Sequence, residues 1–138
     1  NQNPDYVGKR IAEAKAHDQV PMITYYCMAA HGDRNLSVLT DAAYMTTYFK
    51  DFLQMVASVK AASSPVLVHD EPDFWGYMLQ ETTKNGGDPT KLKVLVSTAG
   101  APECAGEPEN VVGLAHCKLK IYRTRAPNAR PACPALSV

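Results

Sequence analysis

Apolar positions along the chain follow two patterns, a helical spacing and short unbroken runs, which together predict alternating helices and strands. The longest helical pattern covers residues 41–62, where apolar side chains recur on one face of a helix. The predicted helices are 4–17, 41–62, 74–84 and 111–123, and the predicted strands are 20–28, 66–69 and 93–98. This α-β-α-β-α-β-α order is typical of an α/β fold with a parallel sheet and right-handed crossovers.

The predicted elements fit a single domain. We expect residues 1–128 to form one α/β domain and residues 129–138, which contain two prolines and no periodicity, to form an irregular C-terminal tail. Three strands make a small sheet, because sheets usually have about four to six. Either a further strand lies in residues 36–39 or in the tail, or another copy of the chain covers the open edges. We expect the second arrangement, and therefore a homo-oligomer.

Composition narrows the classes of partner. The 138 residues are 46% apolar and 20% charged, values that are typical of a globular domain with its own core. Fourteen basic residues balance fourteen acidic ones, so the net charge favours neither nucleic acid nor an anionic membrane as a partner. No apolar run approaches the roughly 20 residues of a membrane-spanning helix. The composition does not indicate a cellular compartment.

The four cysteines show no metal-binding spacing. Cys27 falls in a predicted strand and Cys117 in a predicted helix, where we expect small buried apolar side chains. Cys104 and Cys133 fall in predicted loops, where a disulfide is an open alternative.

The segment 65–77 carries the candidate catalytic residues, because an apolar strand runs directly into a cluster of acids. Ligands of parallel sheets bind at the carboxyl ends of the strands, and Glu71 and Asp73 follow such an end. Glycoside hydrolysis needs two carboxyl groups, one of them held protonated. We predict Glu71 as the acid/base or nucleophile, with Asp73 or Asp70 as its partner. The alternative is that Glu71 and Asp73 cap the following helix.

Histidines beside these acids allow a second kind of site. His69 could orient a carboxylate or, with Asp70 or Glu71, ligate a divalent metal. His31 and Asp33 lie in the loop after the first predicted strand, which opens on the same face, and Asp33 is a further candidate partner for Glu71. No spacing makes a metal site specific, and His69 could equally be a core histidine.

Aromatic residues near the strand ends are candidates for substrate binding. Trp75, Tyr77, Tyr25 and Tyr26 could stack on sugar rings or could pack in the core. Ser97 follows an apolar run and is a weaker binding candidate, because no Gly-x-Ser-x-Gly motif surrounds it.

Residues 66–78 have the sequence Val-Leu-Val-His-Asp-Glu-Pro-Asp-Phe-Trp-Gly-Tyr-Met. This segment resembles bacterial glycoside-hydrolase-like (β/α)-barrel proteins, in which a strand is followed by His-x-Glu-Pro-Asp, an aromatic residue and glycine. Residues 21–26, 94–100 and 113–128 are similar to further strands and a helix of that family, in the same order. Two departures stand out: an apolar residue is expected where Asp70 stands, and a strand is expected after Asn128, where this chain has no strand pattern.

The resemblance implies a partial TIM barrel, or half-barrel, since a complete (β/α)8 barrel takes about 250 residues. It also implies a hydrolase that acts on glycosidic bonds by carboxylate chemistry, with a carbohydrate or small-molecule substrate and no cofactor. Two alternatives stay open. One is a non-catalytic, self-assembling half-barrel or binding module, and the other is a metal-dependent ester hydrolase.

Overall fold

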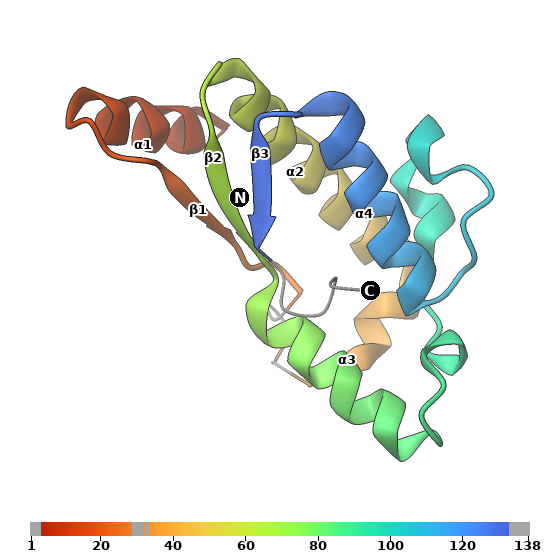
Figure 1. Ribbon diagram of the computed structural model, residues 1–138. Helices are drawn as coiled ribbons and strands as arrows, with labels where there is room; N and C mark the ends of the chain where they lie inside the picture. The colour runs from red at the N-terminus through yellow and green to blue at the C-terminus, as the bar shows by residue number, and fades with distance from the viewer. Residues whose placement is uncertain (1–3, 29–31, 33, 133–138) are drawn as a thin grey trace.

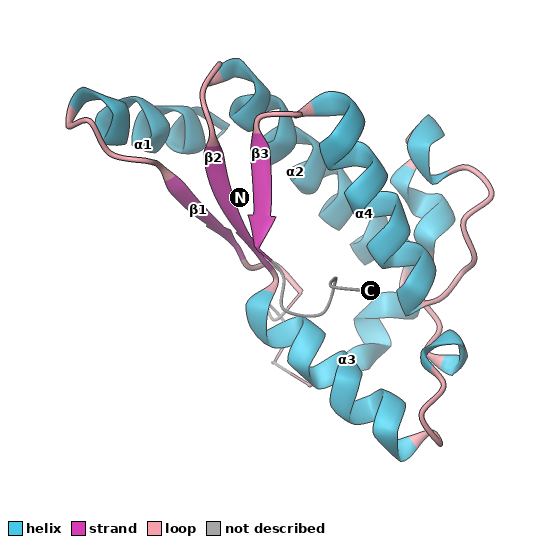
Figure 2. Cartoon of the chain, in the orientation of Figure 1, coloured by secondary structure: helices cyan, strands magenta, loops and turns pink. Residues whose placement is uncertain are grey.

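The computed structural model describes residues 4–28, 32 and 34–132, in which four helices and three strands alternate along most of the chain (Figure 1). The helices are α1 (Pro4–Ala16), α2 (Ala42–Ala61), α3 (Pro72–Lys84) and α4 (Val111–Arg125), and the strands are β1 (Met22–Tyr25), β2 (Val66–Asp70) and β3 (Ala129–Ala132). Short 3-10 helices occupy Leu36–Thr40, Pro89–Lys91, Val96–Ala99 and Pro102–Cys104. Figure 2 shows the small sheet with helices α2 and α4 on one side of it.

The three strands form one parallel sheet in the order β1-β2-β3, so the predicted α/β class is confirmed. In the register Tyr25 lies beside Asp70, and Leu67 lies between Met22 and Arg130. All three strands therefore present their carboxyl ends at the same edge. This edge faces the start of α3, which follows β2 after the single residue Glu71.

One face of the sheet is buried against helices α2 and α4. Val66 and Val68 of β2 are fully buried, and the Tyr25 ring lies 5.6 Å from the Phe52 ring of α2. The Phe52 ring in turn meets Tyr122 of α4 edge-on at 5.3 Å. Aromatic pairs of this kind add to the stabilisation from buried apolar area, so these rings connect the sheet with both helices.

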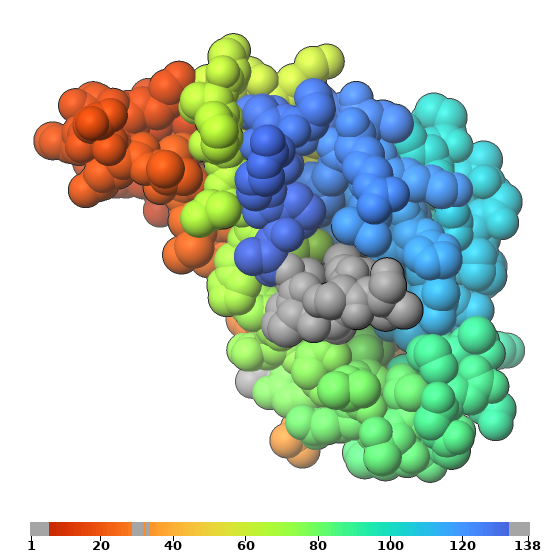
Figure 3. All heavy atoms as spheres, viewed as in Figure 1, coloured from red at the N-terminus to blue at the C-terminus, as the bar shows by residue number. Residues whose placement is uncertain are grey.

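The opposite face of the sheet carries the alternate side chains and is open. Met22 is 63% exposed and Leu67 is 39% exposed, and Figure 3 shows β2 and β3 at the surface on this side. Helix α1 does not cover this face, because it packs against α2, with Lys15 Nζ donating to the Ala62 carbonyl oxygen over 2.9 Å. Parallel sheets normally have both faces covered.

The strand predicted at residues 93–98 is not part of the sheet, which corrects the expected element order. Lys93 forms an isolated antiparallel bridge with Asn110, and the residues that follow form a 3-10 helix. The Glu109 carboxylate accepts hydrogen bonds from two backbone N–H groups of this segment. The Glu109 side chain therefore satisfies backbone N–H groups that would otherwise need hydrogen bonds to a neighbouring strand.

The third strand is instead β3, in the stretch predicted as an irregular tail. That prediction is wrong for residues 129–132, and residues 133–138 lie outside the described part of the chain. Pro131 lacks an N–H donor, and β3 tolerates it because it is an edge strand. The alternative of a further strand in the tail is therefore correct for residues 129–132, whereas residues 36–39 belong to a 3-10 helix.

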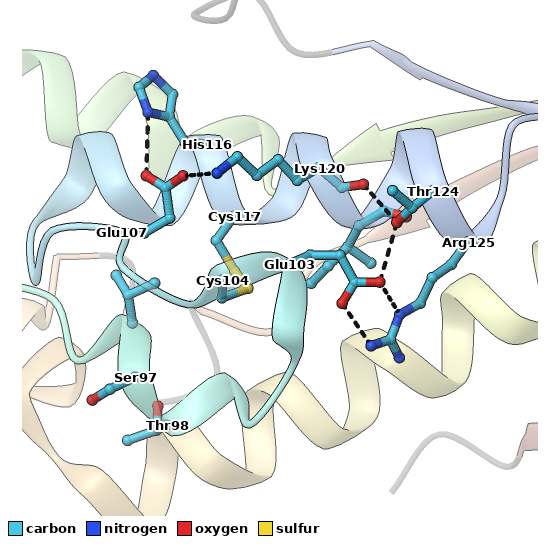
Figure 4. Close-up of a disulfide and its surroundings, with 12 residues drawn as sticks. Ser97, Thr98, Glu103, Cys104, Glu107, His116, Cys117, Lys120, Thr124 and Arg125 are labelled. Atoms are coloured by element: carbon cyan, nitrogen blue, oxygen red, sulfur yellow. Dashed lines mark hydrogen bonds and ion pairs between the residues drawn. A yellow bond between two sulfur atoms is a disulfide. The ribbon is translucent and has the colours of Figure 1, made fainter.

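A disulfide joins Cys104 to Cys117 and holds the segment before α4 against that helix (Figure 4). Both cysteines are buried, whereas Cys27 is a free, half-buried thiol. Cys117 was expected to be an unpaired apolar side chain, and Cys133, the open partner for Cys104, lies outside the described residues. Surface ion pairs strengthen the same contact, including a two-pronged pair between Glu103 and Arg125 at 2.7–2.8 Å.

Within the described residues, no helix combines the length and the apolar character needed to cross a membrane.

Candidate functional site

The ends of β1 and β2 lie side by side and bring the predicted acids next to the residues that follow β1. The Glu71 N–H donates to the Tyr25 carbonyl oxygen over 2.7 Å, which extends the strand pairing by one bond. Beyond this point β1 continues into residues 26–28, and β2 turns into α3. The candidate site is therefore formed by residues 26–28, which follow β1, and by the turn from β2 into α3.

Glu71 makes the turn from β2 into α3 in a left-handed backbone conformation, with φ 48° and ψ 54°. A non-glycine residue adopts this region at an energetic cost, so the surrounding contacts must hold it there. Its carboxylate accepts hydrogen bonds from the N–H groups of Cys27, at 2.9 Å, and Met28, at 3.1 and 3.2 Å. The side chain makes no cap to α3, so it joins β2 to the end of β1 and does not serve the capping role.

The Glu71 side chain is fully buried, and this burial controls its proton affinity. Loss of solvation raises the pKa of Glu71 to about 7. The positive charge of Lys118 and the N–H group of Cys27 oppose this rise in pKa, and the charge of Asp70 adds to it. Glu71 can therefore exchange a proton near neutral pH, as a general acid requires.

Asp70 lies on the buried face of β2, where it forms an ion pair with Lys118 of α4. The Lys118 ammonium is 2.8 Å from the Asp70 carboxylate, and both side chains are almost completely buried. Burial raises the pKa of Asp70, and the Lys118 charge acts against that rise. Asp70 was predicted as a catalytic carboxylate, and the structure places its side chain in the core, in an ion pair with Lys118.

Lys118 was not singled out from the sequence, although the pattern held a signal. It occupies the position of an apolar residue on the buried face of α4, which also carries Leu114 and Ile121. A lysine on such a face requires a buried partner of opposite charge. The acid that stands in place of the expected apolar residue at position 70 is that partner.

Asp73 is the exposed carboxylate of the site. It lies in the first turn of α3 and accepts a hydrogen bond from the Tyr26 hydroxyl over 3.0 Å. The half-buried Tyr77 ring lies one turn further along α3, with the Arg34 guanidinium 5.3 Å from its centre. Tyr26 and Tyr77 therefore flank Asp73 at the surface, where both can contact a ligand.

Two predicted stacking residues belong to the core. The Tyr25 ring is buried, and its hydroxyl donates to the Tyr48 carbonyl oxygen at 3.0 Å. Trp75 is also buried, with its indole N–H donating to the Asp70 carbonyl oxygen at 3.0 Å. Neither ring offers an open face to a sugar, because helix and strand atoms pack around both.

His69 and Ser97, two further predicted residues, lie in different parts of the structure. His69 is half-buried and, by the alternation of β2, lies on the open face of the sheet. Ser97 belongs to the 3-10 helix that packs on α2 and α4, away from the sheet. His31 and Asp33 lie outside the described residues. Across residues 4–28, 32 and 34–132, no three His, Cys, Asp or Glu side chains form a group that could hold a metal ion.

The site contains two carboxyl groups, Glu71 and Asp73, two positions apart and in opposite environments. One is enclosed and binds backbone amides, and the other is exposed beside two tyrosines. No protein-family model, no curated protein and no solved structure matches this chain.

Proposed function

We propose that the chain is a hydrolase that acts on glycosidic bonds, with Glu71 as the protonated acid and Asp73 as the second carboxyl group. The supporting observation is the contrast between the two groups. Burial raises the pKa of Glu71 to about 7, whereas Asp73 is open to solvent. Two carboxyl groups with such different surroundings are the pairing that glycoside hydrolysis uses.

The surface around Asp73 suits a carbohydrate better than an apolar ligand. Tyr26 supplies a ring and a hydroxyl, Tyr77 supplies a second ring, and Arg34 supplies a donor for hydroxyl groups. Aromatic rings bind the apolar faces of sugars, and polar side chains bind their hydroxyl groups.

Reaction at Glu71 requires a movement that exposes its carboxyl group. The backbone at Cys27 and Met28 covers the carboxylate and donates its hydrogen bonds. These bonds weaken when Glu71 takes up a proton, because a neutral carboxyl group is a poorer acceptor. The proposal therefore includes an opening of residues 26–28 that is coupled to protonation of Glu71.

The sheet is consistent with the wall of a (β/α) barrel. Its strands follow the chain in spatial order, and α2 and α4 pack on one face while the other face stays open. In a barrel the helices surround the outside, and the inner face meets the other strands. We propose on this basis that the open face of the sheet corresponds to the inner face of a partial barrel.

The test is the hydrolysis of a series of aryl glycosides by the wild type and Glu71→Gln. The proposal expects a rate loss of about 10²–10⁴-fold, which is the usual contribution of a general acid. The loss should be larger for phenyl than for dinitrophenyl glycosides, because the better leaving group needs less protonation. Glu81→Gln is the matched control, since Glu81 lies on α3 in a surface ion pair with Lys84. Equal rates for the wild type and Glu71→Gln would refute the assignment.

A second candidate function is a non-catalytic half-barrel that assembles with another copy through the open sheet face. The exposure of Met22 and Leu67 on a parallel sheet favours it. Sedimentation velocity of the wild type and Leu67→Glu tests this reading. It predicts a dimer that the substitution dissociates, and a monomeric wild type at all concentrations would contradict it.

A further inference from the structure

The ion pair between Asp70 and Lys118 lies next to Glu71, yet no step of the proposed hydrolysis uses it. Asp70 directly precedes Glu71 in the chain, and Lys118 reaches Asp70 from α4 across 2.8 Å. Lys118 also donates to the Tyr48 hydroxyl, and rings surround its ammonium group. The ring centres lie 4.6 Å away for Phe52, 5.1 Å for Tyr48 and 5.4 Å for Tyr25.

Four titratable groups on β1, on the residues after it and on α2 interact with Glu71. Burial raises the pKa of Tyr25 and of Tyr48 far above 10, and that of Tyr44 to about 12. Burial also raises the pKa of the Cys27 thiol. These four groups, from β1 with the residues after it and from α2, are therefore neutral near pH 7.

The largest charge effects on Glu71 come from Lys118 and Asp70, while His69 on β2 and the exposed Asp73 on α3 lie two positions from it in the chain. Lys118 and Asp70 act in opposite directions, because a positive charge favours the ionised carboxylate and a negative charge favours the protonated acid. In the low-dielectric interior such charges act more strongly than at the surface.

We propose that Lys118 and Asp70 are positioning residues for Glu71, and that their opposed charges set the pH at which Glu71 releases its proton. The inference rests on the proposed role of Glu71 as the acid. The covering of the carboxylate by Cys27 and Met28 then depends on the same pair, since the ionised form binds these N–H groups best.

The test follows the side-chain carboxyl carbon of Glu71 by NMR during a pH titration of the full chain. Asp70→Asn leaves the Lys118 charge without its partner and should lower the Glu71 midpoint by about one pH unit. Asp70→Asn combined with Lys118→Met removes both charges and should raise the midpoint, because Lys118 exerts the larger effect of the two on Glu71.

The double variant also keeps the experiment interpretable. A buried pair replaced as a unit is often tolerated, whereas removal of one partner leaves an uncompensated buried charge. Lys120→Met is the matched control. Lys120 lies on the same helix, but it pairs with Glu107 at the surface and should leave the midpoint unchanged.

Opposite shifts in the two variants support the proposal, because a loss of packing alone would shift the midpoint in the same direction in both. Unchanged midpoints, or shifts of the same sign in both variants, overturn it. In the wild type and in the double variant, the pH at which hydrolysis declines should move with the NMR midpoint. A protein that shows opposite shifts but no hydrolysis would refute the proposed function and leave this inference standing.

Discussion

Replacing Glu71 with glutamine should remove a large part of the pH dependence of folding stability. The pKa of Glu71 rises from the ordinary value of 4.5 to about 7 because the carboxyl group is enclosed by protein. One pKa unit corresponds to about 1.4 kcal/mol, so this rise is equivalent to about 3 kcal/mol. Glu71 is fully buried, and solvent screening does not reduce this value.

The sign follows from the affinity of the two states for the proton. The folded protein binds the Glu71 proton more tightly than the unfolded chain does, so protonation stabilises the fold. This stabilisation is complete below pH 4.5 and is lost as the pH rises from 4.5 to about 7. Glutamine at this position cannot titrate. It retains a carbonyl oxygen that can accept the hydrogen bond from Cys27.

Urea denaturation at half-unit steps from pH 4.5 to 8 measures the effect. The wild type should lose about 3 kcal/mol more than Glu71→Gln across this interval. Asp73→Asn is the comparison variant, because it replaces an exposed carboxylate two positions from Glu71. Parallel stability profiles for the wild type and Glu71→Gln would refute the reasoning from burial.

Two further predictions concern packing and covalent structure. The disulfide between Cys104 and Cys117 closes a loop with a sequence separation of 13. Its reduction should lower the free energy of unfolding, measured by urea denaturation, by about 3 kcal/mol. A loss below about 1 kcal/mol would contradict this prediction. Gly113→Ala should destabilise the protein by about 1–3 kcal/mol, because the new Cβ would lie 1.9 Å from a backbone carbonyl oxygen. Gly8→Ala, in the open on helix α1, should instead stabilise it by about 0.5–1 kcal/mol, and equal thermal shifts in the two variants would contradict this contrast.

The strongest parts of the sequence pattern predicted the fold well. The apolar stripe of residues 41–62 matches α2, which begins at Ala42 after the Asp41 cap and ends at Ala61. The run at 66–69 matches β2 and its place in the centre of the sheet. Both elements bury a continuous apolar face, so their local pattern and their tertiary environment agree.

The third strand could not be predicted, because local pattern and tertiary pairing disagree there. Val94 and Val96 are buried, as their apolar run suggests, yet their segment pairs with loop groups outside the sheet. The four residues of β3 include an arginine and a proline and show no β propensity. Their pairing with β2 depends on where α4 ends, and no local signal carries that information.

The sequence predicted where the candidate site lies in the fold, but not which groups surround its carboxyl groups. The sequence places Glu71 and Asp73 at the end of β2, and the structure puts both there. It could not show that the Glu71 carboxylate turns back to the amides of Cys27 and Met28, since these residues are more than 40 positions away. The pairing of Asp70 with Lys118 spans 48 positions and was missed for the same reason.

The central claim is that the enclosed Glu71 carboxyl group keeps its proton up to neutral pH at the carboxyl end of β2. Its pKa in the wild type, read from the ¹³C shift of the side-chain carboxyl carbon during a pH titration, tests this claim most directly. The account predicts a midpoint at about pH 7. A midpoint at or below 4.5 would contradict it.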